Sequence, residues 1–219
     1  MLTRSLVALA LLVALSATAA AHFVFIVPES ANKARVVFSN SLEPDQKVPI
    51  AKIAATKLLL RDAKGKVSPL TWTKGEHSYA VEVPGTGSRI VYGVTDYGIV
   101  QKGTAKPYLL RYHSKAIVGP IPKRGGFDKH QAIELVPEVS DGKVVFWVHT
   151  NAKLIANAEV HVLQKSGEET LTTESHGRTK AIDVKGQCGV YVRHTDKTAG
   201  KDYDEVRLYA TLVFDLAGK

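Results

Sequence analysis

The clearest chemistry in this chain belongs to a histidine that follows a run of small residues. The run 17–21 reads Ala-Thr-Ala-Ala-Ala, which is typical of a signal-peptide cleavage zone, and His22 comes directly after it. Cleavage after Ala21 makes His22 the mature N-terminus, so that its free amine and imidazole can chelate one metal ion together. Cleavage after Ala19 makes it the third residue, which suits square-planar Cu(II) or Ni(II) because the amine, two amides and the imidazole supply four nitrogens. The sequence is compatible with both cleavage positions.

Two further histidines stand at the ends of strand-like segments, where binding loops are often mounted. His194 follows the apolar run 188–193, and Asp196 in the same polar loop can orient its imidazole or bind metal directly. His113 ends a second such run. We therefore expect a metal site in which His22 is completed by His194 or His113. Two imidazoles and an amine form the T-shaped arrangement called a histidine brace in copper proteins.

Other kinds of site find little support in the residues. The chain has no Gly-x-Ser-x-Gly elbow, no His-Glu-x-x-His pair and no phosphate-binding Gly-x-x-x-x-Gly-Lys loop, so we expect no enzyme activity. The acidic residues of the segment 196–205 fit no EF-hand spacing and alternate with lysines, which is typical of a solvated loop. The remaining histidines are expected to be solvated or structural: His77, His130, His149, His161 and His176.

Residues 1–21 predict a secretory signal peptide, with a basic Arg4 and an apolar stretch at 6–15. That stretch is shorter than the ~20 residues needed to span a bilayer, and no later run approaches this length. We therefore expect a periplasmic or secreted protein that is not embedded in the membrane. The single cysteine, Cys188, excludes an intrachain disulfide, and its apolar surroundings predict a buried thiol.

The formal net charge of +8 raises the question of nucleic-acid binding. The lysines are scattered along the chain and form no dense basic stripe interleaved with aromatic residues, so we expect no nucleic-acid partner. A basic balance of this kind favours solubility and weak attraction to anionic envelope surfaces.

The secondary-structure elements that position these candidate residues are expected to be β-strands. Nearly every apolar segment is short, rich in Val, Ile, Tyr and Phe, and bounded by Gly, Pro, Asn or Asp. Only 49–56 suggests a short helix or an irregular link. The class is therefore all-β, as two immunoglobulin-like or transthyretin-like sandwiches in tandem. The expected strands are 22–28, 34–40, 56–61, 78–83, 89–95, 108–113, 131–136, 143–149, 158–164, 168–173, 188–194 and 205–214.

A linker is expected at 119–130, where prolines, glycines and cations make a poor strand. It would separate an N-terminal sandwich at 22–118 from a C-terminal sandwich at 131–219, each near the usual size of about 100 residues.

The C-terminal half resembles the transthyretin-like or carboxypeptidase-regulatory sandwich. The resemblance rests on the segment 154–162, Gly167, the Leu-Thr-Thr at 171–173, Gly177 and the Gly-Val-Tyr-Val at 189–192. Alternation places Val160 and Val162 on one face of their strand and His161 on the other.

A wider resemblance covers almost the whole mature chain. The motifs that carry it are 21–23, 37–39 with 43–44, 92–94, 108–112, 193–197, 203–207 and 209–212. The chain resembles an uncharacterised periplasmic family associated with nickel or cobalt uptake, a NikM-like group, which implies metal binding. One position departs from that pattern, because this chain has Leu208 where members often carry a histidine.

These observations favour an exported protein that binds Ni, Co or Cu without catalytic turnover and hands the ion to a membrane transporter. Two alternatives remain open. One is an envelope interaction module that uses no metal. The other is a histidine-brace copper oxygenase, which the absence of a tryptophan cluster around Trp72 or Trp147 disfavours.

Overall fold

The structure is a computed structural model that describes residues 22–122 and 131–216. The expected signal peptide 1–21, most of the expected linker and the last three residues lie outside this range. The described residues confirm the all-β class. The strands are β1 (Phe23–Ser30), β2 (Lys33–Ser39), β3 (Lys57–Arg61), β4 (Val67–Leu70), β5 (Trp72–Lys74), β6 (Tyr79–Glu82), β7 (Arg89–Val100), β8 (Tyr108–Val118), β9 (Ile133–Ser140), β10 (Lys143–Thr150), β11 (Lys153–Leu154), β12 (Glu159–Gln164), β13 (Gly167–Thr172), β14 (Ile182–Asp183), β15 (Gly186–Asp196) and β16 (Glu205–Leu216), with a 3-10 turn at Ile50–Ile53.

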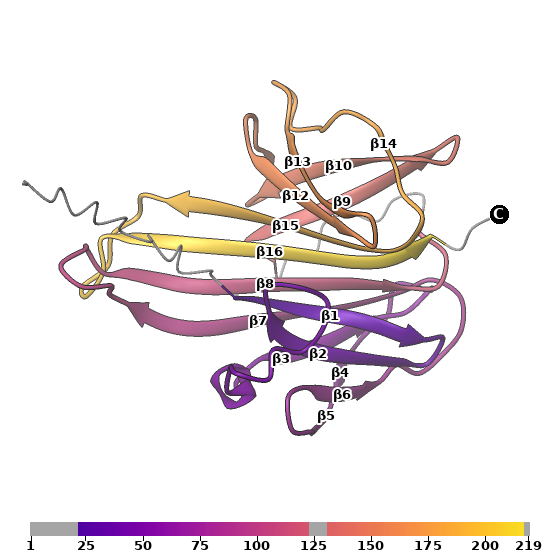
Figure 1. Ribbon diagram of the computed structural model, residues 1–219, viewed down its shortest axis with the longest axis horizontal. Coiled ribbons are helices and arrows are strands. Elements are labelled where there is room, and N and C mark those ends of the chain that lie inside the picture. The colour runs from indigo at the N-terminus through magenta and orange to yellow at the C-terminus, as the bar shows by residue number, and fades with distance from the viewer. Residues whose placement is uncertain (1–21, 123–130, 217–219) are drawn as a thin grey trace, which may run out of the picture.

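The strands form three sheets, stacked as layers around a long central one (Figure 1). The central sheet has eight strands in the order β13-β12-β15-β16-β8-β7-β3-β4. A sheet of β1, β2, β6 and β5 packs on one face, and a smaller sheet of β9, β10, β11 and β14 packs on the other. The β-sandwich architecture is thereby confirmed, with the central sheet serving as the inner layer of two sandwiches.

The two halves of the sequence meet inside the central sheet. Strand β8 comes from the N-terminal half and β16 from the C-terminal half, and they pair in parallel from Tyr108–Glu205 to Ala116–Val213. Their neighbours β7 and β15 pair with them in antiparallel fashion. The N-terminal and C-terminal halves are therefore joined by a continuous hydrogen-bonded ladder.

Strands β8 and β16 are buried on both faces over most of their length, and apolar side chains of both strands face each of the two cores. Side chains such as Tyr112 and Val213 enter the first core, shared with β1 and β2. Side chains such as Ile117 and Leu212 enter the second core, shared with β9 and β10. Cys188 lies in this second core, and burial raises the pKa of its thiol to about 12, so the predicted buried cysteine is confirmed.

Strand β1 is held on the central sheet by two hydroxyl groups as well as by its apolar side chains. Residues 23–27 of this strand are buried. The Val24 carbonyl accepts a hydrogen bond from Ser114 Oγ on β8 and another from Thr211 Oγ1 on β16, each at 2.7 Å. Buried carbonyl groups need such partners, so these hydroxyls join β1 directly to the two central strands.

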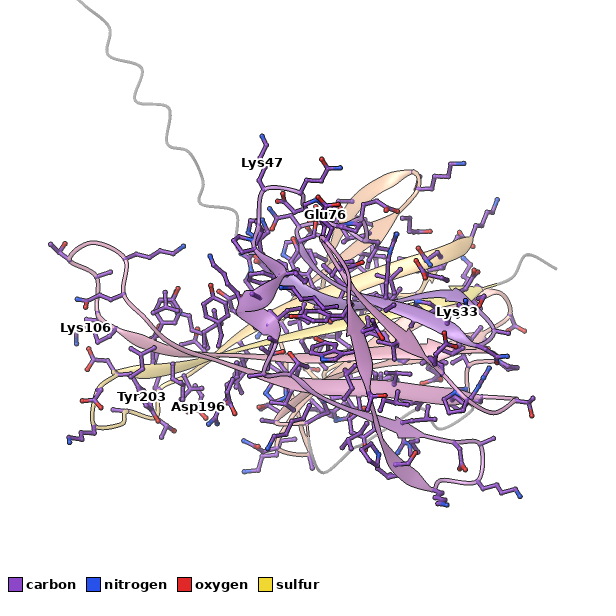
Figure 2. All side chains as sticks on the ribbon, turned by 90° about the horizontal axis from the view of Figure 1, so that it is seen from below. Lys33, Lys47, Glu76, Lys106, Asp196 and Tyr203 are labelled. Carbon is purple, nitrogen blue, oxygen red and sulfur yellow. The ribbon has the colours of Figure 1, made fainter. Side chains whose placement is uncertain are left out.

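At one end the central sheet extends as two hairpins, β7–β8 and β15–β16. Figure 2 shows Lys106 at the tip of the first hairpin beside Asp196 and Tyr203 of the second. The Asp204 amide donates to the Pro107 carbonyl at 3.0 Å, and the Arg207 guanidinium lies 3.7 Å from the centre of the Tyr108 ring. The two hairpins therefore form one four-stranded extension of the sheet.

Candidate functional site

His22 directly precedes β1 and forms a hydrogen bond to Asp45 near the surface. Its Nε2 donates to Asp45 Oδ2 at 2.8 Å, and its ring packs 5.5 Å from that of Phe38 on β2. The hydrogen bond from His22 lowers the pKa of Asp45 below its usual value. The imidazole is 23 % exposed, so it remains accessible.

His113 is buried within β8. Its Nδ1 donates to Gln131 Oε1 at 3.1 Å, and its Nε2 has no hydrogen-bond partner among the described residues. Burial lowers the pKa of His113 to about 4, and this effect outweighs the hydrogen bond to Gln131. The ring is therefore neutral near pH 7.

His194 and Asp196 lie two residues apart near the end of β15, on the same face of that strand. The Asp196 carboxylate accepts hydrogen bonds from the Thr198 hydroxyl at 2.6 Å and from the Thr198 amide at 2.9 Å. These bonds lower the pKa of Asp196. In this structure Asp196 therefore holds the turn after β15.

The structure does not assemble the expected cluster of His22 with His113 or His194. His22 contacts Phe38, which belongs to the first core. His113 and His194 stand opposite Ala210 and Leu208 on β16, and both of these belong to the second core. The central sheet thus separates His22 from the other two. Over residues 22–122 and 131–216, no group of three or more His, Cys, Asp or Glu side chains could hold a metal ion.

A buried ion pair that the sequence analysis missed joins the central sheet to the β9–β10 sheet. Lys115 Nζ on β8 lies 2.7 Å from Glu134 Oε1 on β9, and the two residues are 2 % and 4 % exposed. His149 on β10 stands opposite Glu134, and burial lowers its pKa. The signal in the sequence is a charged residue beside apolar ones in each of two strands, Lys115 before the Ala-Ile-Val at 116–118 and Glu134 between Ile133 and Leu135.

Aromatic rings from separate strands gather where β1 meets the central sheet. The His161 and Tyr191 rings stack 4.4 Å apart and almost parallel, and Phe23 packs 4.1 Å from Tyr191 on β15. Tyr209 on β16 lies 5.4 Å from Phe23. Tyr191 donates its hydroxyl hydrogen to Glu168, and burial with this carboxylate raises the pKa of Tyr191 to about 12. These four rings form a floor just beneath the surface, in which Phe23, Tyr191 and Tyr209 are at most 8 % exposed.

Arg193 lies across this floor. Its guanidinium is 5.0 Å from the centre of the Phe23 ring and 5.7 Å from the rings of Tyr191 and Tyr209. We call the set of Phe23, His161, Tyr191, Arg193 and Tyr209 the Arg193 platform.

The Arg193 side chain is exposed, and no carboxylate within the described range pairs with it. Other arginines near the same end are neutralised, because Arg207 pairs with Glu205 at 2.9 Å and Arg111 with Asp96 at 2.6 Å. A guanidinium without a carboxylate partner presents a planar set of N–H donors that matches a carboxylate or a phosphate.

The sequence analysis did not identify this platform. The alternation of Tyr191 and Arg193 with Val190 and Val192 is a signal that two polar-tipped side chains share one strand face. The contributions of Phe23 and Tyr209 come from strands far apart in the chain and require the tertiary structure.

No helix of membrane-spanning length and hydropathy occurs in the described part of the chain. No protein-family model matches the chain, and no curated protein sequence matches it.

Solved structures with some likeness include a two-domain fibronectin type-III segment of chicken tenascin, at 11% identity over 87% of this chain and 98% of that chain, with a TM-score of 0.25. A DUF3823 family protein from Bacteroides ovatus matches at 12% identity over 86% of this chain and 97% of that chain, with a TM-score of 0.20. Pullulanase from Anoxybacillus sp. LM18-11 matches at 15% identity over 77% of this chain and 24% of that chain, with a TM-score of 0.22. Scores this low carry no conclusion about function.

Proposed function

We propose that this chain is an exported interaction module, without catalytic turnover, that recognises an oxyanion group of a partner through the Arg193 platform. The observation that carries this proposal is the exposed guanidinium of Arg193, which rests on three aromatic rings and has no acidic partner within the described residues.

The aromatic floor prepares Arg193 for binding in two ways. Stacking restricts the long side chain, so less rotamer entropy is lost when a ligand binds. Contact with the rings also leaves the edge of the guanidinium open toward solvent, where two N–H groups can grip one carboxylate or phosphate. A charge-assisted contact of this kind contributes about 1.5–3 kcal/mol.

A binding series with hexaglutamate, and hexaglutamine as the neutral control, tests the proposal. We expect hexaglutamate to bind and Arg193→Ala to weaken that binding at least about tenfold, in line with the loss of one charge-assisted contact. Arg193→Lys should retain only part of the affinity of the natural chain, because an ammonium lacks the planar set of N–H donors of a guanidinium. Arg111→Ala is the matched control, since Arg111 is already paired with Asp96. Equal weakening by both alanine variants would refute a specific role for Arg193.

A second candidate function is capture of a Ni, Co or Cu ion at the mature N-terminus, as the NikM-like resemblance implies. One observation favours it. The Nε2 atom of His22 is hydrogen-bonded to Asp45, whereas the Nδ1 atom of the same ring has no hydrogen-bond partner within the described residues. The ring is also partly exposed. Nδ1 is the nitrogen that closes a six-membered chelate with the amine of an N-terminal histidine. The Asp45 carboxylate would orient the ring from behind.

Equilibrium dialysis of the naturally processed protein against Ni(II), Co(II) and Cu(II) tests this candidate, together with intact-mass measurement of the mature end. We expect His22→Ala to abolish binding and Asp45→Asn to weaken it about 10-fold or more. His194→Ala should leave the affinity unchanged, because His194 lies on the opposite face of the central sheet. Affinity that survives His22→Ala would refute a site at this residue.

A further inference from the structure

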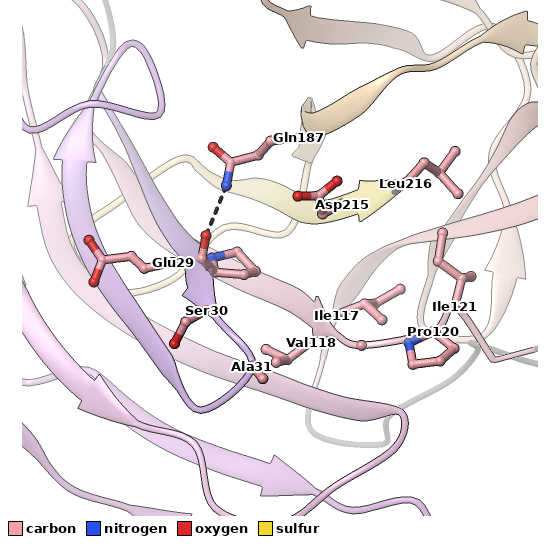
Figure 3. Close-up of a pocket in the computed structure, with 12 residues that line it drawn as sticks. Glu29, Ser30, Ala31, Ile117, Val118, Pro120, Ile121, Gln187, Asp215 and Leu216 are labelled. Atoms are coloured by element: carbon pink, nitrogen blue, oxygen red, sulfur yellow. Dashed lines mark hydrogen bonds between the residues drawn. The ribbon is translucent and has the colours of Figure 1, made fainter. Parts of the chain in front are cut away.

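A pocket opens at the end of the central sheet opposite the two extended hairpins. The parallel pairing of β8 and β16 ends at Ala116–Val213, and beyond this pair the two strands separate. The space between them has a volume of about 580 Å³, within the usual range for small-molecule sites (Figure 3). The turn after β1 forms a third wall through Ser30 and Ala31.

The two strands separate because, beyond this point, each one pairs only with the strand on its other side. Strand β8 remains paired with β7 up to Val118, whereas β16 remains paired with β15 up to Leu216. Gly119 then turns the chain away with a φ of +87°, at a point where a Cβ atom would lie 2.4 Å from the Gly87 carbonyl oxygen. Only glycine fits there, so the opening is built into the fold.

The walls of the pocket are mostly apolar. Ile117 and Val118 come from β8, Leu216 comes from β16, and Pro120 with Ile121 continues the surface past Gly119. Ile117 and Val118 are almost fully buried, so the accessible apolar surface, on which a short aliphatic chain can lie, comes from Pro120, Ile121 and Leu216.

The charge of the pocket is opposite to that of the molecule. Among its lining residues the acidic groups are Glu29 and Asp215, and none is a lysine or an arginine, although the chain has a formal net charge of +8. Glu29 is already engaged, because its carboxylate lies 3.6 Å from Arg35. Asp215 is exposed and has no cationic partner among the described residues.

Polar contacts also fix the position of the wall beside Asp215. Gln187 at the start of β15 donates through Nε2 to the Pro28 carbonyl at 2.8 Å (Figure 3). This bond ties the end of β1 to the edge of the central sheet. Asp215 stands opposite Gln187 in the β15–β16 ladder. Its carboxylate therefore lies beside a part of the pocket wall that this hydrogen bond holds in place.

We infer that this pocket binds a small aliphatic ammonium ligand. The alkyl chain would lie on Pro120, Ile121 and Leu216, and the ammonium would meet the Asp215 carboxylate. The main-chain edges of β8 and β16 that face the pocket have no ladder partner in the described residues beyond Ala116–Val213, so they offer further acceptors. This site is independent of the Arg193 platform and selects the opposite charge.

Titration of the full chain with hexylammonium chloride and with sodium hexanoate, followed by NMR of the backbone amides, tests the inference. We expect hexylammonium to shift the amides of Ile117–Gly119 and Leu216, and hexanoate to bind at least about tenfold more weakly. Binding of both probes with equal affinity, or shifts confined to another part of the molecule, would overturn the assignment.

Two variants locate the charge. Asp215→Asn should weaken hexylammonium binding about five- to tenfold, as expected for the loss of one exposed charge contact. Asp202→Asn, an equally exposed change in the β15–β16 hairpin at the other end of the sheet, should leave the affinity unchanged. Both positions lie at the surface, so both variants should fold. Equal affinities for the two variants would contradict a role for Asp215.

A third probe separates a free amine from a lysine side chain of a partner protein. We expect Nα-acetyl-lysine methylamide to bind more weakly than hexylammonium, because its peptide groups cannot lie on the apolar walls. Tighter binding of the lysine derivative would overturn the assignment of a small ligand.

Discussion

Individual charged residues in this molecule differ sharply in how fully they are paired. Arg207 and Arg111 have carboxylate partners within 3 Å, whereas the exposed Arg193 contacts aromatic rings. Exposed ion pairs contribute little to stability, so the pairing matters chiefly because it sets which cation remains available. Arg193 has no carboxylate partner among the described residues and rests on aromatic rings, which is why the binding hypothesis rests on it.

The pH dependence of stability should reveal the buried His113. Its folded-state pKa of about 4 lies below the ordinary value of about 6.5, so the unfolded chain takes up the proton first as the pH falls. Near pH 7 the neutral His113 makes no charge-based contribution to stability. Between pH 7 and pH 4, preferential protonation of His113 in the unfolded chain lowers the free energy of unfolding by about 3 kcal/mol.

Urea denaturation of the natural chain and of His113→Gln, at pH 7, 6, 5 and 4.5, measures this effect. Glutamine keeps a polar group at the site but does not titrate, so the variant should lose less stability on acidification. Because other groups titrate in both proteins, the difference between the two curves is the informative quantity. Parallel curves would rule out the proposed proton uptake at His113.

At the scale of secondary-structure elements, the β9–β10 sheet is attached to the central sheet partly through Lys115 and Glu134. Breaking a buried ion pair is costly, whereas replacing both partners with apolar groups often is not. We expect Lys115→Met or Glu134→Leu alone to lower the free energy of unfolding by about 3–5 kcal/mol, and the double variant to lose less than either single one. Chemical denaturation of all four proteins gives the coupling energy, and strictly additive losses would argue against the pair as a unit.

Most of the elements, but little of their arrangement, could be predicted from the sequence. The alternation of Val160 and Val162 with polar neighbours predicts a strand directly, since the period is local. The parallel pairing of β8 with β16 has no local signal, because nothing near Tyr108 or Glu205 specifies the distant partner. The candidate sites follow the same rule. His22 is conspicuous by its position, whereas the rings under Arg193 meet only once β1, β15 and β16 are assembled.

At the scale of the whole molecule, the central sheet belongs to both hydrophobic cores. Strands β8 and β16 contribute alternate side chains to the first and the second core, so neither core can be dismantled without exposing the other. The two sandwiches are therefore expected to unfold together, as one cooperative unit.

The two tryptophans provide separate probes of this coupling. Trp72 stacks on Tyr79 at 4.1 Å in the β1–β2–β6–β5 sheet, and Trp147 lies on β10 in the opposite outer sheet. In single-tryptophan variants made with Trp147→Phe or Trp72→Phe, fluorescence should change over the same urea range in both, once each curve is corrected for the variant's own stability. Two separate transitions would show that the sandwiches unfold independently.

The two hydroxyl groups that bind the Val24 carbonyl also bear on how the chain reaches this structure. They join residues separated by 90 and 187 positions in the sequence. Synthesis delivers β1 long before β16, so β1 has no complete binding surface until β16 has emerged. Contacts this distant slow the search for the native state, typically to milliseconds or seconds. An apolar strand that is made early and pairs with one made much later is exposed to mispairing, and a holding chaperone would be most useful during that interval.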